Sequence, residues 1–380
     1  MLTPESRLRD FPALAHMTYL NTAAESIPPL CVHEAIAQYV RDKNEGMHGR
    51  VAHYAAVEQC REISARLLGL LPEEVSFCSC SSEAYNLLAS ALQLRPQDEV
   101  IVTDLDFPAG ATVWINSPAP PITRLWRARE GALAVDDLLP LLNERTRLVQ
   151  VSLVSFLNGH RLDWPPFIST VRKLAPHALV SVDITQALGR VVLDCAGADC
   201  LISSTHKWTL GIHGGCVVGI PKHRAQALTT HAGGWYHLEN AFAPDRFDRA
   251  VGKLGAASYS VGMPNFVALY ALNASLRYLW EIGVANIAAH ADPLVLRLES
   301  GLWELGITPM AIQRADAASG IISFLHPATA QINSRLEAAQ VQVMHHAGRL
   351  RMAVHGYNTE ADVARFLDVL RDALRTITFP

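Results

Sequence analysis

Three short polar segments each follow an apolar run, and their residue types could bind an anion, a cation and a carbonyl group. Ser81 and Ser82 stand between such a run and a helical pattern, where free backbone N–H groups and the helix dipole favour a phosphate. Asp183 ends another run, and a buried carboxylate there needs a cationic or hydrogen-bonding partner. Lys207 follows a third run, where desolvation would lower its pKa and make the amine a nucleophile for carbonyl groups.

Each segment taken alone has a simpler interpretation. Ser82 and Asp183 could each cap the helix that follows, and Lys207 could reach into the solvent. Taken together, an anion cradle, a carboxylate for a protonated ring nitrogen and a lysine that bonds to an aldehyde are what pyridoxal phosphate requires. The three segments therefore predict a pyridoxal phosphate site.

The elements that must position these residues are short apolar strands. The runs are apolar on successive residues, which is typical of strands buried on both faces of a largely parallel sheet. Helical patterns separate them, and this alternation predicts an α/β domain whose ligand lies at the carboxyl ends of the strands. The runs are 75–80, 100–103, 148–154, 179–182, 200–203 and 216–220.

The pattern changes after Pro264, where the helical stretches become longer. We expect one helix to begin with Asp292 as its N-cap and Pro293 in its first turn, and the last helix to begin after Thr359 as its cap. The predicted division is an N-terminal arm over 1–18 that packs on the small domain, a large cofactor-binding domain over 19–265 and a small C-terminal domain over 266–380.

Composition and charge exclude several other classes of protein. The chain has 380 residues, of which 50% are hydrophobic and 18% are charged, as in a globular protein. Its 32 lysines and arginines against 36 aspartates and glutamates give a net charge of −4, so no surface for nucleic acid is expected. No apolar run approaches the roughly 20 residues of a bilayer span, and no signal peptide, zinc motif or P-loop occurs. The odd count of 7 cysteines favours free thiols in a reducing compartment, so we expect a cytoplasmic location. Because metal motifs and membrane-spanning runs are absent from the sequence, we expect no metal and no membrane contact.

The order of the segments resembles a family pattern. SSEAYNL, VDITQALG and SSTHKW followed by HGGCVVG are similar to motifs of the fold-type I pyridoxal-phosphate enzymes of aminotransferase class V. That group includes cysteine desulfurases, selenocysteine lyases, kynureninase, isopenicillin N epimerase and several aminotransferases. YLNTAA, GMPN and RMAVHGYNT resemble further motifs of the group, so the resemblance covers about residues 19–365. Its most specific part is Asp183-x-x-Gln186 followed by Ser204-x-His206-Lys207.

The resemblance implies a fold-type I architecture: a large domain with a mainly parallel seven-stranded sheet, and a smaller C-terminal α+β domain. It also implies a small, amino-acid-like substrate and a homodimer with the active sites at the interface. In such a dimer, Gly262 and Met263 would complete the phosphate site of the partner subunit.

Roles of individual residues also follow from the resemblance. Lys207 would bond to the cofactor aldehyde and later carry the proton at the substrate Cα, and Asp183 would keep the ring nitrogen protonated. Phe107 would stack on the ring, or it could be an ordinary core residue. Arg351 would hold the substrate carboxylate, or it could form a surface ion pair. The expected catalytic residues are Lys207 and Asp183; the expected cofactor-binding residues also include Ser81, Ser82, Phe107, Gln186, Ser204, His206, Gly262 and Met263; the expected substrate-binding residues are Arg351, Asn21 and His53.

The sequence departs from the family pattern around the substrate. The segment 338–351, where cysteine desulfurases carry their nucleophilic cysteine, contains no cysteine. Met263 replaces the threonine of the GTPN motif, Phe156 stands where desulfurases carry an asparagine, and Ala353 replaces the serine of the RxS motif. A persulfide-forming desulfurase is therefore not expected.

Pyridoxal phosphate enzymes differ in which bond at Cα breaks, and that choice depends on the shape of the pocket. The leading prediction is an aminotransferase-like or epimerase-like enzyme that acts at Cα of an amino acid or related amine. One alternative is a β-elimination lyase for a C–S or C–Se bond without a catalytic cysteine. Another is a non-catalytic protein that binds the cofactor. The sequence leaves the substrate, the stereochemistry and the reaction among these open.

Overall fold

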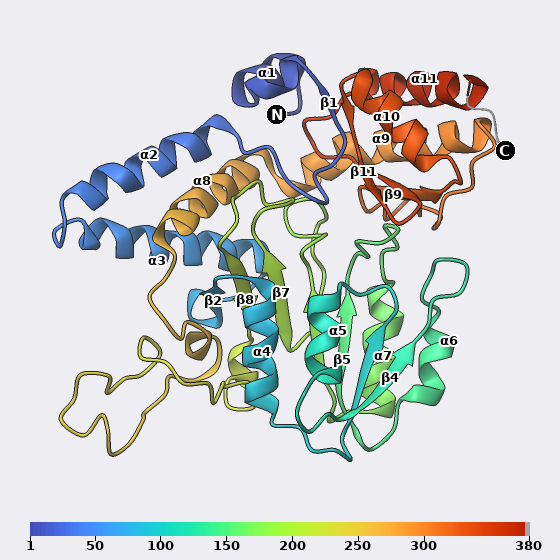
Figure 1. Ribbon diagram of the computed structural model, residues 1–380. Coiled ribbons are helices and arrows are strands. Elements are labelled where there is room, and N and C mark those ends of the chain that lie inside the picture. The colour runs from blue at the N-terminus through green and yellow to red at the C-terminus, as the bar shows by residue number, and fades with distance from the viewer. Residues whose placement is uncertain (377–380) are drawn as a thin grey trace.

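The apolar runs of the sequence become strands of one large sheet. A computed structural model describes residues 1–376 (Figure 1). The strands of the large sheet lie in the order β2-β8-β7-β6-β5-β3-β4; β8 is antiparallel to both neighbours and the other ladders are parallel. The predicted α/β fold with a mainly parallel seven-stranded sheet is confirmed. These strands are β2 (Val75–Cys78), β3 (Glu99–Thr103), β4 (Ile122–Trp126), β5 (Thr146–Ser152), β6 (Leu179–Asp183), β7 (Cys200–Ser204) and β8 (Cys216–Gly219).

Helices account for most of the remaining regular structure. They are α1 (Pro4–Asp10), α2 (Leu30–Asn44), α3 (Arg50–Leu68), α4 (Ser81–Leu92), α5 (Pro108–Ile115), α6 (Val135–Leu138), α7 (Trp164–Leu174), α8 (Phe266–Ile282), α9 (Val284–Glu304), α10 (Thr329–Ala338) and α11 (Glu360–Thr376).

The large sheet is buried on both faces, which explains its uninterrupted apolar runs. Val149 of β5 belongs to a core cluster with Phe167 of α7, whereas its neighbour Leu148 belongs to another cluster with Leu88 of α4. Successive side chains of a strand point to opposite faces, so each face is covered by its own helices. β4 is the exception, because it lies at the edge of the sheet and most of its side chains are partly or fully exposed.

A smaller lobe contains the second sheet, β11-β12-β9, with antiparallel pairing throughout (Figure 1). Its strands are β9 (Ile321–Leu325), β11 (Met344–His346) and β12 (Arg349–Ala353). Helices α9, α10 and α11 share its core, in which Leu298, Leu336 and Phe366 are buried beside Met352 of β12. Arg351 lies on β12, so this lobe positions the residue that is expected to bind the substrate carboxylate.

Two predictions of helix starts have different outcomes. The predicted start at Asp292 is wrong, because α9 begins at Val284 and continues through Pro293. Asp292 pairs instead with the buried Arg190, with 2.7 Å between Oδ1 and Nη2. The predicted cap of the last helix is confirmed: Thr359 Oγ1 accepts from the backbone N–H of Asp362, and the Asp362 carboxylate accepts from the backbone N–H of Thr359.

The N-terminal segment contacts the small lobe. Arg7 of α1 donates to the carbonyl oxygen of Tyr357 at 2.8 Å and pairs with Asp362 at 3.4 Å. β1 (Thr18–Tyr19) pairs in parallel with β10 (Val341–Gln342). The division into 1–18, 19–265 and 266–380 stays a prediction, and residues 377–380 lie outside the described residues.

Residues 1–376 contain no helix that is long and apolar enough to cross a membrane, and no group of three or more potential metal ligands. The cysteines are free thiols. The cytoplasmic location stays a prediction.

Candidate active site

A cavity of about 150 Å³ lies at the carboxyl ends of the central strands. The last residues of β5, β6 and β7, which are Ser152, Asp183 and Ser204, all face it, as expected for a parallel sheet. The full lining consists of Cys80, Ser81, Phe107, Ser152, Val154, Phe156, Asp183, Thr185, Gln186, Ser204, His206 and Lys207. The fold therefore brings together seven of the residues predicted from the sequence: Ser81, Phe107, Asp183, Gln186, Ser204, His206 and Lys207.

Lys207 is the amine of this cavity. Burial lowers the pKa of its ammonium group to about 8, and the positive charge of Arg351 acts in the same direction, whereas Asp183 and Glu25 partly oppose the shift. Its Nζ lies 5.4 Å from the centroid of the Phe107 ring, which is 43% exposed and so is not an ordinary core side chain. An amine with this pKa is substantially neutral near pH 8, and the neutral form is the nucleophile.

We expect covalent capture of pyridoxal phosphate by the cofactor-free protein to increase with pH. Because the pKa of Lys207 is about 8, the ammonium form predominates below pH 8 and the reactive neutral amine predominates above it. The rate constant should therefore rise about tenfold from pH 7 to pH 9 and then level off. Stopped-flow absorbance measures this rate. A rate that still rises tenfold per pH unit above pH 9 would show an ordinary lysine pKa and contradict the burial argument.

Asp183 is held in place by two donors. The hydroxyl group of Tyr85 donates to Oδ2 at 2.9 Å, and the backbone N–H of Thr185 donates to Oδ1 at 2.8 Å. Burial raises the pKa of Tyr85 well above its usual value, and the negative charge of Asp183 adds to this, so the hydroxyl group remains a donor. Gln150 Nε2 in turn donates to the Tyr85 oxygen at 3.4 Å. Sequence reasoning missed Tyr85, although it follows Ser81 by one turn of the same helix.

A second carboxyl group, Asp106, lies behind the cavity wall. It accepts from Ser152 Oγ at 2.8 Å and from the backbone N–H of Thr103 at 2.9 Å. Burial raises its pKa to about 7, and the negative charge of Asp183 contributes. Near pH 7 this carboxyl group is therefore about half protonated, which reduces the negative charge behind the cavity wall.

Gln186 is also fixed by the protein. Its Oε1 accepts from the indole N–H of Trp208 at 2.6 Å, and its Nε2 donates to the carbonyl oxygen of Ala23 at 3.0 Å. These two bonds determine which way the amide points and leave one of its two N–H donors for a ligand oxygen.

Ser81, Ser204 and His206 line the cavity and carry hydroxyl and imidazole groups of the kind that bind an anion. Burial lowers the pKa of His206 to about 4, and the charges of Lys207 and His213 add to this. The His206 ring stacks on the ring of His213 with 4.0 Å between centroids, and His213 Nε2 lies 2.8 Å from Glu25 Oε2. The stack fixes the plane of the His206 ring in the cavity wall.

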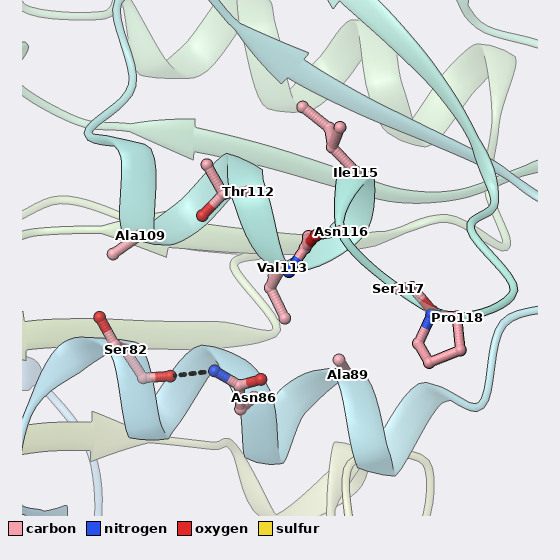
Figure 2. Close-up of a pocket in the computed structure, with 10 residues that line it drawn as sticks. All are labelled: Ser82, Asn86, Ala89, Ala109, Thr112, Val113, Ile115, Asn116, Ser117 and Pro118. Carbon is pink, nitrogen blue, oxygen red and sulfur yellow. Dashed lines mark hydrogen bonds between the residues drawn. The ribbon is translucent and has the colours of Figure 1, made fainter.

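Ser82 is placed differently from Ser81. It lines a separate cavity of about 760 Å³ between α4 and α5, shown in Figure 2, where its carbonyl oxygen accepts from Asn86. That cavity is larger, but none of its lining residues carries a titratable side chain. Gly262 and Met263 line a third cavity, of about 160 Å³, together with Ser79 and Glu83. The structure therefore does not bring Ser82, Gly262 and Met263 to the cavity of Lys207.

Arg351 reaches the site from the small lobe. Its Nη1 donates to the carbonyl oxygen of Phe156 at 2.8 Å, and its Nε is buried without a hydrogen-bond partner among residues 1–376. Asn21 lies next to its strand through a bridge to Ala353, and the Asn21 Oδ1 atom is likewise buried and unpaired. Buried unpaired polar atoms of this kind are candidates for ligand binding.

His53 lies away from the cavity, in the packing of α2, α3 and α8. Its Nδ1 atom is 3.2 Å from the hydroxyl oxygen of Tyr270, and its ring stacks on Phe266 with 5.0 Å between centroids. Its role in substrate binding stays a prediction.

The residues that are present fit pyridoxal phosphate. The cavity combines a partly neutral amine, a carboxylate, a free amide N–H, an exposed aromatic ring and hydroxyl and imidazole groups for an anion. Lys207 would hold the aldehyde carbon, Asp183 the ring nitrogen and Gln186 the ring oxygen. Phe107 would lie against the ring, and Ser81, Ser204 and His206 would hold the phosphate.

Comparison with known proteins gives one family and several relatives. The sequence model described as Aminotransferase class-V matches residues 18–366. The chain is 26% identical to "Uncharacterized aminotransferase YcbU" of Bacillus subtilis, over 98% of both chains. It is also 26% identical to a "Probable cysteine desulfurase" of Pseudomonas putida, over 99% of this chain and 100% of the relative. A solved structure of a C-DES mutant, with glycine covalently linked to its PLP cofactor, superposes with a TM-score of 0.86 at 20% identity, over 96% of this chain and 99% of that one.

Proposed function

The chain belongs to the aminotransferase class V family, and we therefore propose that it transfers the amino group of an amino acid, with pyridoxal 5′-phosphate as its cofactor. The observation that carries this proposal is the cavity in which the low-pKa Lys207 lies beside Asp183, with Arg351 close by. When bound, the cofactor supplies an aldehyde for amines and a ring that withdraws electrons from the substrate Cα.

Each side chain has a defined task in this proposal. Lys207 Nζ takes the proton from the substrate Cα, because it is an amine that lines the cavity and its pKa of about 8 leaves a substantial fraction neutral near pH 8. Asp183 keeps the ring nitrogen protonated, and Tyr85 and the backbone of Thr185 prevent its carboxylate from turning away. Arg351 binds the substrate carboxylate through the fork of its guanidinium group.

The hairpin before Arg351 argues against a desulfurase. β11 and β12 are joined at Ala347 and Gly348, whose φ angles of 51° and 71° are those of a tight two-residue turn. Neither this turn nor the rest of 338–351 contains a cysteine. Of the cysteines, Cys80 lines the cavity, but it belongs to the segment before α4 and not to this hairpin. No thiol of the hairpin is thus available to accept sulfur from a substrate.

Single-turnover experiments test the proposed reaction. The cofactor-loaded protein is mixed with individual amino acids, and the products are identified by absorbance and mass spectrometry. Formation of a 2-oxo acid together with pyridoxamine phosphate supports amino-group transfer. Pyruvate with sulfide would identify a lyase, a racemised amino acid would identify an epimerase, and no change with any amino acid would identify a binding protein; each of these contradicts the proposal.

Replacing Arg351 by alanine should mainly raise KM. The loss of a desolvated guanidinium–carboxylate pair should lower kcat/KM by the equivalent of about 2–4 kcal/mol, with a smaller effect on kcat. Steady-state kinetics measure both, and Arg335→Ala, an exposed site on α10, is the matched control. If kcat/KM is unchanged in Arg351→Ala, another residue binds the carboxylate.

A homodimer is part of the same proposal. Gly262 and Met263 lie apart from the cavity of Lys207, and Met263 is 36% exposed although its side chain is apolar. This placement supports a role for both residues in the phosphate site of a second copy of the chain.

A further inference from the structure

Arg349 and Arg351 lie on one face of β12, because side chains two residues apart in a strand point the same way. Both guanidinium groups meet Phe156: Arg351 Nη1 donates to its carbonyl oxygen at 2.8 Å, and Arg349 Cζ lies 6.0 Å from the centroid of its ring. Phe156 lines the cavity of Lys207. The two arginines therefore flank the side of the cavity that Phe156 forms.

Neither arginine has a compensating charge. Arg349 and Arg351 are 7% and 3% exposed, and the Nε atoms of both are buried without a hydrogen-bond partner. Among residues 1–376, no acidic side chain forms an ion pair with either of them. Burial lowers the pKa of both groups, and the charge of Arg349 adds to the lowering of Arg351, to about 10.

Three other guanidinium groups of the chain, one fully buried and two partly buried, have carboxylate partners. Arg190, which is fully buried, pairs with Asp292 at 2.7 Å. Arg172 and Arg224 both pair with the buried carboxylate of Asp199 at 2.6 Å. Two adjacent buried cations without an anion destabilise a fold. A ligand that brings two anionic groups would remove this cost at β12.

We propose that the substrate is an amino acid with an acidic side chain, whose α-carboxylate binds Arg351 and whose side-chain carboxylate binds Arg349. This inference rests on the proposed function, because it takes Arg351 as the group that binds the α-carboxylate. A neutral side chain would leave the Arg349 guanidinium group, whose Nε is buried, without an anionic partner. Arg349 would therefore favour acidic substrates over neutral ones.

The spacing suits a short dicarboxylate. Residues two apart in a strand are about 6.7 Å apart along the chain, and flexible arginine side chains can bring their guanidinium groups closer together. Aspartate, glutamate and 2-aminoadipate each carry two carboxylates, and the separation between these carboxylates increases in that order. Their relative affinities therefore report the distance between the two guanidinium groups.

Binding of unreactive analogues tests the role of Arg349 independently of turnover. Glutarate and pentanoate have chains of equal length but differ in the second carboxylate, and neither has an amino group to transfer. Calorimetry of the cofactor-loaded protein should show Arg349→Gln weakening glutarate binding by about 10–100-fold while changing pentanoate binding by less than about twofold. Arg349→Lys should restore part of the glutarate affinity, and Arg335→Gln should change neither.

A kinetic comparison separates this inference from the proposed function. In the wild type, kcat/KM for the best acidic amino acid should exceed that for its amide by about 100-fold or more, and Arg349→Gln should remove most of this preference. If no amino acid donates its amino group but the glutarate result holds, the proposed function fails and the anion site stands. If neutral amino acids react well and glutarate binds no better than pentanoate, the anion site fails and the proposed function stands.

A structural role for Arg349 gives a different pattern. Arg349→Gln would then weaken glutarate and pentanoate equally, or change the melting temperature or the oligomeric state together with both affinities. Either result overturns the proposal.

Discussion

Lys207→Ala is expected to abolish covalent attachment of the cofactor and to reduce turnover by at least about 10²–10⁴-fold, the range typical of a lost general base. The substitution removes the amine of the cavity, the group that bonds to the aldehyde and moves the proton at Cα. Borohydride reduction followed by peptide mapping measures the attachment, and steady-state assays measure the turnover.

The fold should survive this change. Replacing a buried ammonium group by alanine removes a desolvated charge, so the melting temperature of the cofactor-free protein should not fall. Lys222→Ala, at an exposed position after β8, is the matched control and should retain both attachment and activity. A pyridoxyl label on any other lysine of the wild type would refute the assignment.

Asp183→Asn should retain the cofactor but lower kcat by about 10²–10³-fold, the typical cost of losing one preorganised electrostatic contact in an active site. The amide remains within reach of the Tyr85 hydroxyl group, so the geometry is conserved while the negative charge that keeps the ring nitrogen protonated is lost. Cofactor occupancy from absorbance and kcat from the amino-transfer assay distinguish binding from chemistry.

Asp194→Asn, which removes an exposed carboxylate outside the cavity, is the control for this change. If Asp183→Asn retains full activity, another carboxyl group faces the ring nitrogen. Asp106 is then the alternative, because it is a buried carboxyl group that accepts from Ser152, a residue of the cavity lining.

The sequence predicted the parts of the fold and site that depend on local signals. Uninterrupted apolar runs indicated the buried strands, and polar residues directly after them indicated Ser81, Asp183 and Lys207. β4 was missed because an edge strand does not need an apolar run on both faces. The start of α9 was predicted wrongly because Asp292 does not cap a helix but forms an ion pair with Arg190, a residue distant in sequence.

Other parts of the site could not be predicted because tertiary packing creates them. Tyr85 and Asp106 acquire their roles from contacts with residues far away in the chain. The unpaired state of Arg349 is also a property of the packed lobes, since a sequence shows a charged residue but not the absence of its partner.

Residues at and around the cavity come from segments that are far apart in the sequence, and this has a consequence for its assembly during synthesis. The carbonyl oxygen of Ala23 orients Gln186, and the guanidinium group of Arg351 approaches from the other side. Contacts between residues so distant in sequence form only after long loops have closed, and Arg351 leaves the ribosome after Ala23 and Gln186. A nascent chain that has exposed only its large sheet therefore lacks part of the pocket, and capture of the vitamin-derived cofactor in its final geometry requires the small lobe as well.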